Sequence, residues 1–469
     1  MLPPQLALVV WSFLLLLLLR YASPKDGASS SVLWVPVIWI VMAGSRSPAQ
    51  WLGMVPTSNA IAFEEGSPLD RSVYLILIGL ALWILAKRQF SWREAFSRNA
   101  VLTLFLLLAL ASVAWSDFPF ITFKRWIRDL GTYLMVLVVL SDPRPVEAIS
   151  LVLRRLSYVL LIFSVVLIKY YPELGILYEP WTGSPEYIGA TTSKNMLGVL
   201  CLVSGLFYFW DTLRPWSERR DRTSRRLFFV NLALSAMTLW LLRLSQSATS
   251  QGSLIIGCLI IAVVRSKWAR VNPRRVTALI PVGLAVYLVL EFVFDFSSIV
   301  ADLFGRDPTL HGRTGIWNAV LALQTNPLVG AGYQSFWLGG RLTAAWSSLS
   351  TGFLNEAHNG YLEIYLSLGL VGLALLVLFM ISSYRKACRQ LTTPRHFASL
   401  TLGLWTVMVF YNITESAFAA SLLWSVFLLL IVVVPRAKAE SPEPIAPVPR
   451  TRAFILPRHV RPRGAGEAR

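Results

Sequence analysis

The stretch 305–365 contains histidine and arginine residues, which could move a proton and bind an anion. His358 precedes a long apolar run, and a histidine accepts a proton near neutral pH, so it would suit a general base acting on a sugar hydroxyl. Arg313 precedes a helix expected to begin near Thr314, where backbone N–H groups also favour an anion. From spacing alone, the alternative for His358 is a helix-start residue bonded to the loop backbone.

These residues need elements to position them, and the composition indicates membrane-spanning helices. Hydrophobic residues make up 55% of the 469-residue chain and charged residues only 14%. In globular proteins about a quarter of all residues are usually charged. Because apolar runs long enough to cross a bilayer recur throughout, the sequence predicts an all-α, polytopic transmembrane helix bundle. The formal net charge of +18 then reflects cationic loops, and nucleic-acid binding is not expected.

The bundle is expected to have about thirteen spans, or twelve if the short run 31–44, which contains Pro36, is not one of them. The first run lacks a basic start and a convincing cleavage site, so it is interpreted as a span and not as a signal peptide. The spans are 5–20, 31–44, 72–86, 100–115, 127–140, 150–169, 188–210, 227–243, 253–265, 276–296, 359–382, 398–412 and 417–434.

This pattern divides the chain into four parts. Residues 1–296 hold the first ten spans, 297–358 form one large loop, 359–434 hold the last three spans, and 435–469 form a disordered, basic tail. A loop as long as 297–358 inside a compact protein is usually functional. Within it, 315–324 has the apolar spacing of a short amphipathic helix, so the loop is expected to be a small subdomain over the membrane face.

Basic loops predict the orientation, because short cationic loops stay in the cytoplasm. Four such loops lie at 87–98, 214–226, 265–275 and 385–395. Alternation of the spans places all four on one side, together with the C-terminal tail. The loop 297–358 and His358 are then expected on the opposite, external side.

Several cations fall on that external side, where the same charge bias disfavours them. They are Lys124, Arg125, Arg128, Lys194, Arg243, Arg306, Arg313 and Arg341. Ionisable residues in or beside a span indicate a functional site, and guanidinium groups match phosphate oxygens in bidentate geometry. We therefore expect these cations to converge on a diphosphate. The alternative is that they snorkel to lipid head groups or pair with Glu173, Glu179 and Glu186.

Cysteine and histidine offer no metal-ligand spacing in the sequence. Cys201 and Cys258 lie in apolar runs, and Cys388 lies in a basic loop. We expect neither a metal nor a cofactor.

Five motifs, which together cover much of 189–434, resemble those of the O-antigen ligase and Wzy-type polysaccharide polymerase family, most closely its exopolysaccharide polymerases. They are Ser193-Lys194-Asn195, Gly305 to Trp317, Asn326 to Tyr333, Ala357 through Glu363 with Leu368 to Gly372, and Asn412 to Ser416. The chain departs from the family at His311, where Thr is usual, and at Ala248, where some members have Arg. The first 120 residues match only by hydropathy.

The resemblance implies a GT-C-like bundle acting as a metal-independent glycosyltransferase in the bacterial inner membrane, with its active site facing the periplasm and its C-terminus in the cytoplasm. The donor would be an undecaprenyl-diphosphate-linked oligosaccharide. The partners would be an acceptor glycan, the lipid bilayer and a chain-length regulator protein. His358 would be the catalytic base, and Arg313 would neutralise the diphosphate leaving group. The substrate-binding residues would be Arg306, Arg125, Arg128, Lys194, Asn195, Asn359, Glu363 and Glu415.

The expected activity is polymerisation of exopolysaccharide or O-antigen-type repeat units. The donor side does not distinguish this activity from that of a ligase attaching the glycan to lipid A-core or protein. A hypothesis of a different class is a transporter or flippase of lipid-linked sugars. The halves of the chain show no repeat and the unusual charges gather at one face, which favours an enzyme.

Overall fold

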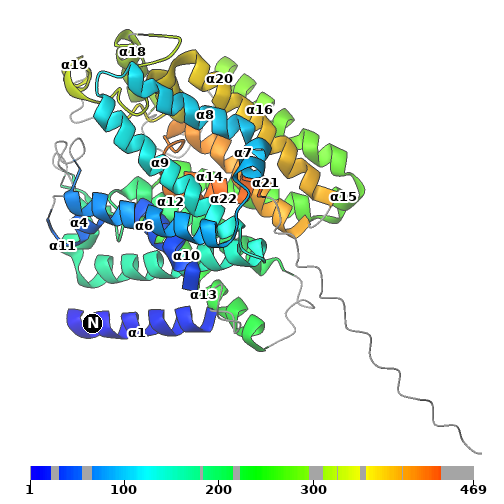
Figure 1. The fold of residues 1–469 in the computed structure, drawn as a ribbon. Helices are drawn as coiled ribbons and strands as arrows, with labels where there is room; N and C mark the ends of the chain where they lie inside the picture. Colours follow the sequence, from blue (N-terminus) through cyan, green and yellow to red (C-terminus); the bar gives the residue numbers. More distant parts are fainter. Residues whose placement is uncertain are drawn as a thin grey trace, which may run out of the picture. The chain divides into compact units, whose positions relative to one another are not determined.

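Helices account for nearly all the regular structure in the computed structural model (Figure 1). A helix satisfies its own backbone hydrogen bonds, which a segment in a bilayer must do, so long apolar runs fold this way. The expected all-α membrane bundle is confirmed. The structure describes residues 2–22, 31–54, 66–179, 183–214, 222–294, 310–324, 326–348, 355–392 and 395–434.

The described residues form a series of helices and one small hairpin. The helices are α1 (Pro4–Ala22), α3 (Trp34–Ala43), α4 (Pro48–Trp51), α6 (Pro68–Lys87), α7 (Trp92–Arg98), α8 (Ala100–Ala111), α9 (Pro119–Leu140), α10 (Pro145–Tyr170), α11 (Pro172–Gly175), α12 (Lys194–Thr212), α13 (Arg222–Ser245), α14 (Ala248–Arg265), α15 (Lys267–Val271), α16 (Pro273–Phe294), α18 (Leu310–Ala322), α19 (Gly339–Ser348), α20 (Gly360–Arg389), α21 (Arg395–Thr414) and α22 (Leu422–Ile431). A small antiparallel hairpin, β1 (Ile176–Tyr178) and β2 (Pro185–Tyr187), pairs Leu177 with Glu186 and was not predicted from the sequence.

Each predicted span coincides with a helix, but not every helix is long and apolar enough to cross a membrane alone. Among the described residues eight meet that test, or nine if α7 and the helical segment 100–114, which are bent by 97°, form one span. The eight are Pro4–Ala22, Pro68–Lys87, Pro145–Tyr170, Lys194–Thr212, Arg225–Ser245, Ala248–Arg265, Gly360–Arg389 and His396–Thr414. The expected number of about thirteen includes shorter helices such as α3 and α22, and α9, whose first half is charged.

The core lies around α10, α12, α21 and α22. α12 packs against α13 and α14, and α14 packs against α21 (Figure 1). Every residue of α22 is buried, so protein surrounds this helix on all sides. By contrast, α1 and α16 expose large apolar side chains such as Phe13 and Val282, as expected of helices that face lipid.

Polar contacts bring the four basic loops together at one end of the bundle, which we call the basic end. Lys386 Nζ donates to the carbonyl oxygen of Arg98 at 2.6 Å and so joins the fourth loop to the first. Arg265 contacts the carbonyl oxygen of Leu213 and the ring of His396, and so joins the third loop to the borders of the second and fourth. The four loops therefore share one end, as the alternation of the spans predicts.

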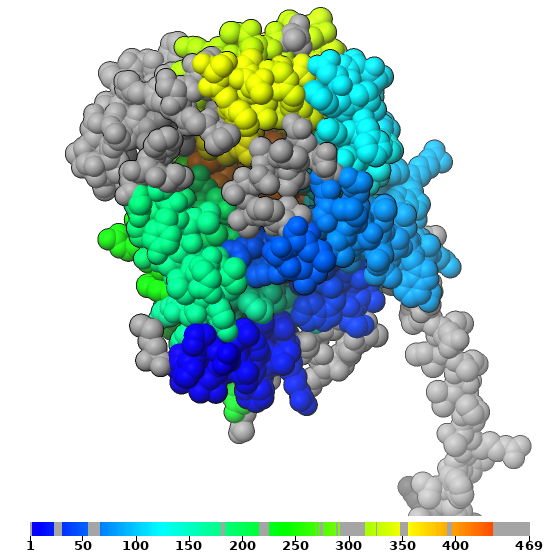
Figure 2. Space-filling model, turned by 90° about the vertical axis from the view of Figure 1, so that its left-hand side faces the viewer, coloured from blue at the N-terminus to red at the C-terminus, as the bar shows by residue number. Residues whose placement is uncertain are grey.

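Segments expected on the external side meet at the other end, which we call the His358 end. Arg341 Nη1 lies 2.5 Å from Asp117 Oδ2, and the Oγ1 atoms of Thr249 and Thr414 are 3.0 Å apart. In Figure 2 yellow residues, the colour of the start of α20, lie beside cyan residues, the colour of the start of α9, and orange residues are visible below them. The two ends of the bundle thus carry different sets of segments.

The described parts of the loop 297–358 have an apolar cluster that is separate from the main core. Ile316 and Val320 of α18 pack in this cluster with Phe336 and Trp337, and Leu323 is partly buried against them. Ile316, Val320 and Leu323, the last of which directly follows α18, are the residues whose spacing predicts an amphipathic helix. The helix begins at Leu310 and not near Thr314, so Gly312 lies inside it.

A backbone break interrupts α20 at Gly369, where φ is 64° and ψ is −163°. The segment 327–332 enters this break and satisfies the freed backbone groups, which a membrane-embedded helix cannot leave unpaired. The bonds are Leu370 N to Pro327 O (2.8 Å), Val371 N to Leu328 O (3.1 Å), Ala331 N to Leu366 O (3.0 Å) and Gly332 N to Ser367 O (3.0 Å). The predicted span 359–382 is therefore two helical pieces.

Glycine is required at both sides of this contact. A Cβ on Gly369 would lie 2.2 Å from the carbonyl carbon of Leu328, and a Cβ on Gly330 would lie 2.4 Å from the carbonyl carbon of Ser367. Both glycines also have positive φ, which side chains disfavour. Two of the motifs noted in the sequence are thus the two halves of one backbone contact.

Candidate functional site

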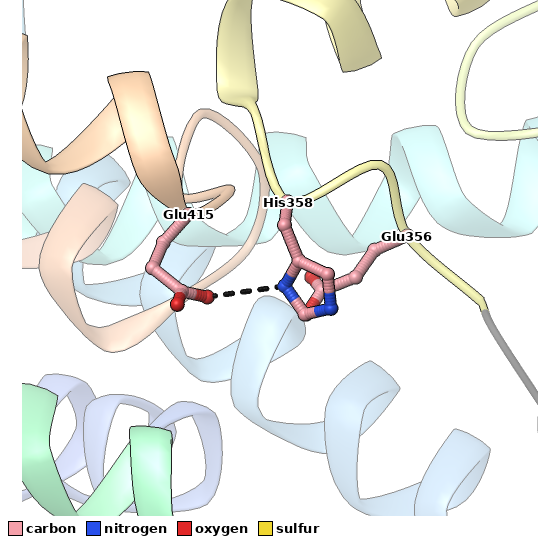
Figure 3. Close-up of side chains that lie close together, drawn as sticks. All are labelled: Glu356, His358 and Glu415. Atoms are coloured by element: carbon pink, nitrogen blue, oxygen red, sulfur yellow. Dashed lines mark hydrogen bonds and ion pairs between the residues drawn. The ribbon is translucent and has the colours of Figure 1, made fainter. Parts of the chain in front are cut away.

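His358 lies between two carboxylates at the start of α20 (Figure 3). Its Nδ1 is 3.3 Å from Glu415 Oε2 and 3.1 Å from Glu356 Oε1. The Glu415 side chain is only 7% exposed, whereas that of Glu356 is 39% exposed and that of His358 25%. The imidazole therefore has one buried and one accessible acidic neighbour.

Two helix ends bring this cluster together. The amide of Gly360, the first residue of α20, donates to the carbonyl oxygen of Glu415 at 2.9 Å. A Cβ on Gly360 would lie 2.0 Å from Asn412 Oδ1, so glycine allows α20 and α21 to approach this closely. Asn359 caps α20, because its Oδ1 accepts hydrogen bonds from the amides of Tyr361 and Leu362.

The backbone of His358 has φ of +48°. Among the described residues it shares a positive φ with three other non-glycine residues, Gln89, Gln246 and Gln334. This conformation is sterically unfavourable for a residue with a Cβ and persists where the surroundings hold it. Such strain often lies at functional sites, so the backbone conformation of His358 adds to the argument from its chemistry.

Asn195 joins the cluster from the first turn of α12. Its Nδ2 donates to Glu415 Oε1 at 3.3 Å, so the Glu415 carboxylate bridges Asn195 and His358. The neighbouring Lys194 instead forms an ion pair with Glu186 of β2, with 2.5 Å between Nζ and Oε1. In this structure Lys194 thus pairs with a loop glutamate, which was the alternative for the external cations.

Glu363, in the first turn of α20, is directed toward the loop before His358. Both of its carboxylate oxygens accept the indole N–H of Trp337, at 2.9 and 3.0 Å. Its Oε1 also accepts the amide of Ala357 at 2.5 Å. Glu363 therefore links the segment between α18 and α19 to the residue that precedes His358. In this structure its carboxylate accepts hydrogen bonds from the protein itself.

A second cluster forms where α9 meets the segment after Gly330. Arg125 donates to the carbonyl oxygen of Gln334, and Arg128 Nη2 donates to Gln334 Oε1 at 3.2 Å. Asp129 Oδ2 accepts hydrogen bonds from Gln334 Nε2 and from the Tyr333 hydroxyl, both at 2.7 Å. Two of the predicted cations thus converge on one glutamine, whose own φ is +53°.

Tyr333 and Asp129 of this second cluster are both buried. Burial, together with the adjacent Asp129 carboxylate, raises the pKa of Tyr333 well above its ordinary value. Tyr333 therefore stays protonated and continues to donate to Asp129. Sequence reasoning missed Asp129, Tyr333 and Gln334, although Asp129 directly follows Arg128 and the other two end or follow the Asn326 to Tyr333 motif.

Arg243 lies in the last turn of α13, and the other remaining external cations fall into two groups. Arg341 pairs with Asp117 and lies 5.8 Å from the centre of the Phe336 ring, and Lys124 Nζ lies 5.1 Å from the Phe120 ring. Arg306 lies outside the described residues. The backbone of Arg313 is in the first turn of α18, and its side chain lies outside the described part. For Arg306 and Arg313, convergence on an anion stays a prediction.

The His358 cluster also offers metal-type ligands, which the sequence spacing did not predict. Nδ1 of His358 and one oxygen each of Glu356 and Glu415 all lie within 4.8 Å of one another. Imidazole and carboxylate groups are ligands for divalent ions such as Zn²⁺ or Mn²⁺. The third ligand, Glu415, comes from a distant part of the chain, so a local spacing rule could not include it.

Comparison with known proteins bears on this arrangement. Residues 232–377, which include His358 and the break in α20, match a family model described as O-antigen ligase. The chain is 26% identical over 302 residues to the exopolysaccharide production protein ExoQ of Rhizobium meliloti (strain 1021). That similarity covers 60% of this chain, which spans 63% of the length of ExoQ. These two matches support the resemblance of the chain to the O-antigen ligase and Wzy-type polysaccharide polymerase family.

Proposed function

We propose that the protein is a glycosyltransferase of the bacterial inner membrane. It transfers a glycan from an undecaprenyl-diphosphate-linked donor to a sugar hydroxyl, at the face that corresponds to the His358 end and to the periplasm. The observation that carries the proposal is the cluster of His358, Glu415 and Asn195, which three distant parts of the chain assemble at one helix start. It supplies a base, and the end that carries it also holds cations for a departing diphosphate.

The transfer can be written with the residues of this chain. The oxygen of the acceptor hydroxyl forms a bond to the anomeric carbon of the donor, while the bond from that carbon to the diphosphate oxygen breaks. The acceptor proton passes to Nε2 of His358, because Nδ1 faces Glu415. The diphosphate leaves with the bonding electron pair, and Arg313, supported by Arg125 and Arg128, neutralises its charge.

The remaining predicted positions have secondary parts in this proposal. Arg306 and Lys194 are further contacts for the diphosphate. Asn359 and Glu363 act through the structure of the α20 start, where both bond to backbone amides. Side-chain cations stabilise the leaving group here, so the proposed reaction requires no metal.

Polymerisation of repeat units is the activity that we propose, since the similar protein ExoQ is an exopolysaccharide production protein. The acceptor is then the glycan of another repeat unit, and a chain-length regulator is a proposed partner. The second candidate is a ligase that attaches the glycan to lipid A-core or protein, which the description of the matching family model favours. A deletion strain separates them: unpolymerised single repeats indicate a polymerase, whereas free polymer lacking its anchor indicates a ligase.

The direct test uses purified protein in detergent with a defined polyprenyl-diphosphate oligosaccharide. Joined repeats and released polyprenyl diphosphate, formed without an ion gradient and in the presence of EDTA, are the expected products. Binding of the donor without any new glycosidic bond would contradict the proposal and would favour the transporter hypothesis.

A further inference from the structure

We infer that Glu415, held by Asn195, is the positioning residue that sets the orientation and tautomer of His358, and that Glu356 does not have this part. The inference rests on the proposed function, because it takes His358 as the base. It goes beyond that function by assigning different parts to the two carboxylates beside the same ring nitrogen.

A single proton creates the choice between the two carboxylates. A neutral imidazole carries one N–H, and the other nitrogen is free to accept. If Nδ1 carries the proton and donates to a carboxylate, Nε2 is the nitrogen that accepts a proton from the substrate. The two distances from Nδ1, 3.3 Å to Glu415 and 3.1 Å to Glu356, are too similar to decide which carboxylate accepts the hydrogen bond from Nδ1.

Burial distinguishes the two glutamates. Glu415 is 7% exposed, and both of its carboxylate oxygens have partners, Asn195 on Oε1 and His358 on Oε2. Glu356 is 39% exposed, and an ion pair that faces solvent contributes little and holds its geometry loosely. A charge-assisted hydrogen bond to a fixed, buried carboxylate is stronger and more directional.

Glu415 also acts on the backbone that presents the ring. Its carbonyl oxygen accepts the amide of Gly360, two residues after His358, and its own amide donates to the carbonyl oxygen of Tyr411 at 3.0 Å. On the other side of His358, the amide of Ala357 is held by Glu363. The strained φ of His358 is thus fixed on both sides, and Glu415 holds both the backbone and the ring.

The test is a kinetic comparison of purified variants with a defined polyprenyl-diphosphate oligosaccharide. Glu415→Gln keeps the shape, but its amide N–H₂ favours the opposite tautomer, in which Nε2 carries the proton. We expect kcat to fall by at least about 10²-fold with KM for the donor changed less than threefold. Glu415→Asp keeps the charge and should recover a measurable part of the lost kcat. Glu356→Gln should lower kcat by less than tenfold.

Two further variants complete the comparison, a second test variant and a control. Asn195→Ala leaves the Glu415 carboxylate in place but loosens it, so kcat should fall about tenfold even if Glu415→Gln does not fold. Glu147→Gln removes an exposed carboxylate that pairs with Arg144 at 3.2 Å, and should leave kcat unchanged. Thermal unfolding of each purified variant shows whether it is folded.

Three results would overturn the inference. The first is wild-type kcat in Glu415→Gln or in Asn195→Ala, and the second is an equal loss in Glu356→Gln. The third is a wild-type activity that EDTA removes and Zn²⁺ or Mn²⁺ restores, since Glu356, His358 and Glu415 would then act as metal ligands. Donor binding by the wild-type protein without any new glycosidic bond would instead overturn the proposed function, so the two failures can be told apart.

Discussion

The two ends of the bundle both collect charged side chains, but they use them differently. At the basic end, Arg88 donates to the carbonyl oxygen of Val138 and to Ser141 Oγ, both at 2.8 Å, and pairs with Asp142. Such contacts fasten one helix end to the next. At the His358 end, an imidazole, a buried carboxylate and an amide from three distant parts of the chain meet at one point. Charge alone therefore does not distinguish the candidate site from the basic end, whereas the convergence of different groups does.

The sharpest way to break this comparison is to remove the imidazole. His358→Ala should lower kcat by about 10⁴-fold, because general base catalysis and the orientation of the acceptor are lost together. Binding of the lipid-linked donor should persist, which a filter-binding or fluorescence assay with the same donor checks. If turnover survives, the base lies elsewhere, for example at Glu363 or Glu415.

Removing the predicted leaving-group cation should have the next largest effect. Arg313→Ala should reduce transfer by about 10³-fold while the protein still inserts and folds, since one stabilising charge at the diphosphate is lost. Arg313→Lys keeps the charge but not the bidentate geometry, so it should lose less transfer activity than Arg313→Ala. Near-normal polymer from Arg313→Ala in cells would exclude this role.

The contact that carries the segment 327–332 into α20 can be tested through its glycines. Gly330→Ala should destabilise the fold by about 2–5 kcal/mol, because its φ is +70° and its Cβ would meet the backbone of Ser367. Gly283→Ala in α16, where nothing lies within 4 Å of an added Cβ, is the matched control and should be neutral or slightly stabilising. Thermal unfolding in detergent compares the two, and equal melting temperatures would refute the role of the contact.

The smallest difference is expected when one arginine is removed from each end. Arg128→Ala at the His358 end should lower kcat/KM about tenfold, since Gln334 loses a partner and the donor loses a cation. Arg144→Ala at the basic end removes an exposed ion pair, and its kcat/KM should stay within about twofold of the wild-type value. Similar losses in the two variants would mean that the ends do not differ in function.

Local patterns predicted a large part of this architecture. Hydropathy located every helix that spans or lines the bundle, and the positions of lysine and arginine grouped the four basic loops, because both signals are set by the bilayer and not by tertiary contacts. His358 and Asn359 were recognisable because they begin an apolar run. The helix at Leu310 starts earlier than predicted, since Gly312 was interpreted as a turn residue and is helical.

Other features depended on contacts between distant residues. Glu415 lies 57 positions after His358, so no spacing rule pairs them. The run from Leu368 to Gly372 is apolar throughout, and the break at Gly369 exists only because the segment 327–332 supplies its hydrogen bonds. The contact of Arg125 and Arg128 with Gln334 likewise follows from that insertion and not from the sequence of α9.

The most direct measurement maps where the diphosphate head group binds. A polyprenyl-diphosphate analogue with a photoreactive group beside the phosphates would be crosslinked to the purified protein, and labelled peptides would be identified by mass spectrometry. We expect labelling of peptides that contain Arg125 and Arg128, Arg313, Gln334 or His358, and competition by the unmodified donor. Labelling confined to the basic loops 214–226 or 385–395 would contradict it.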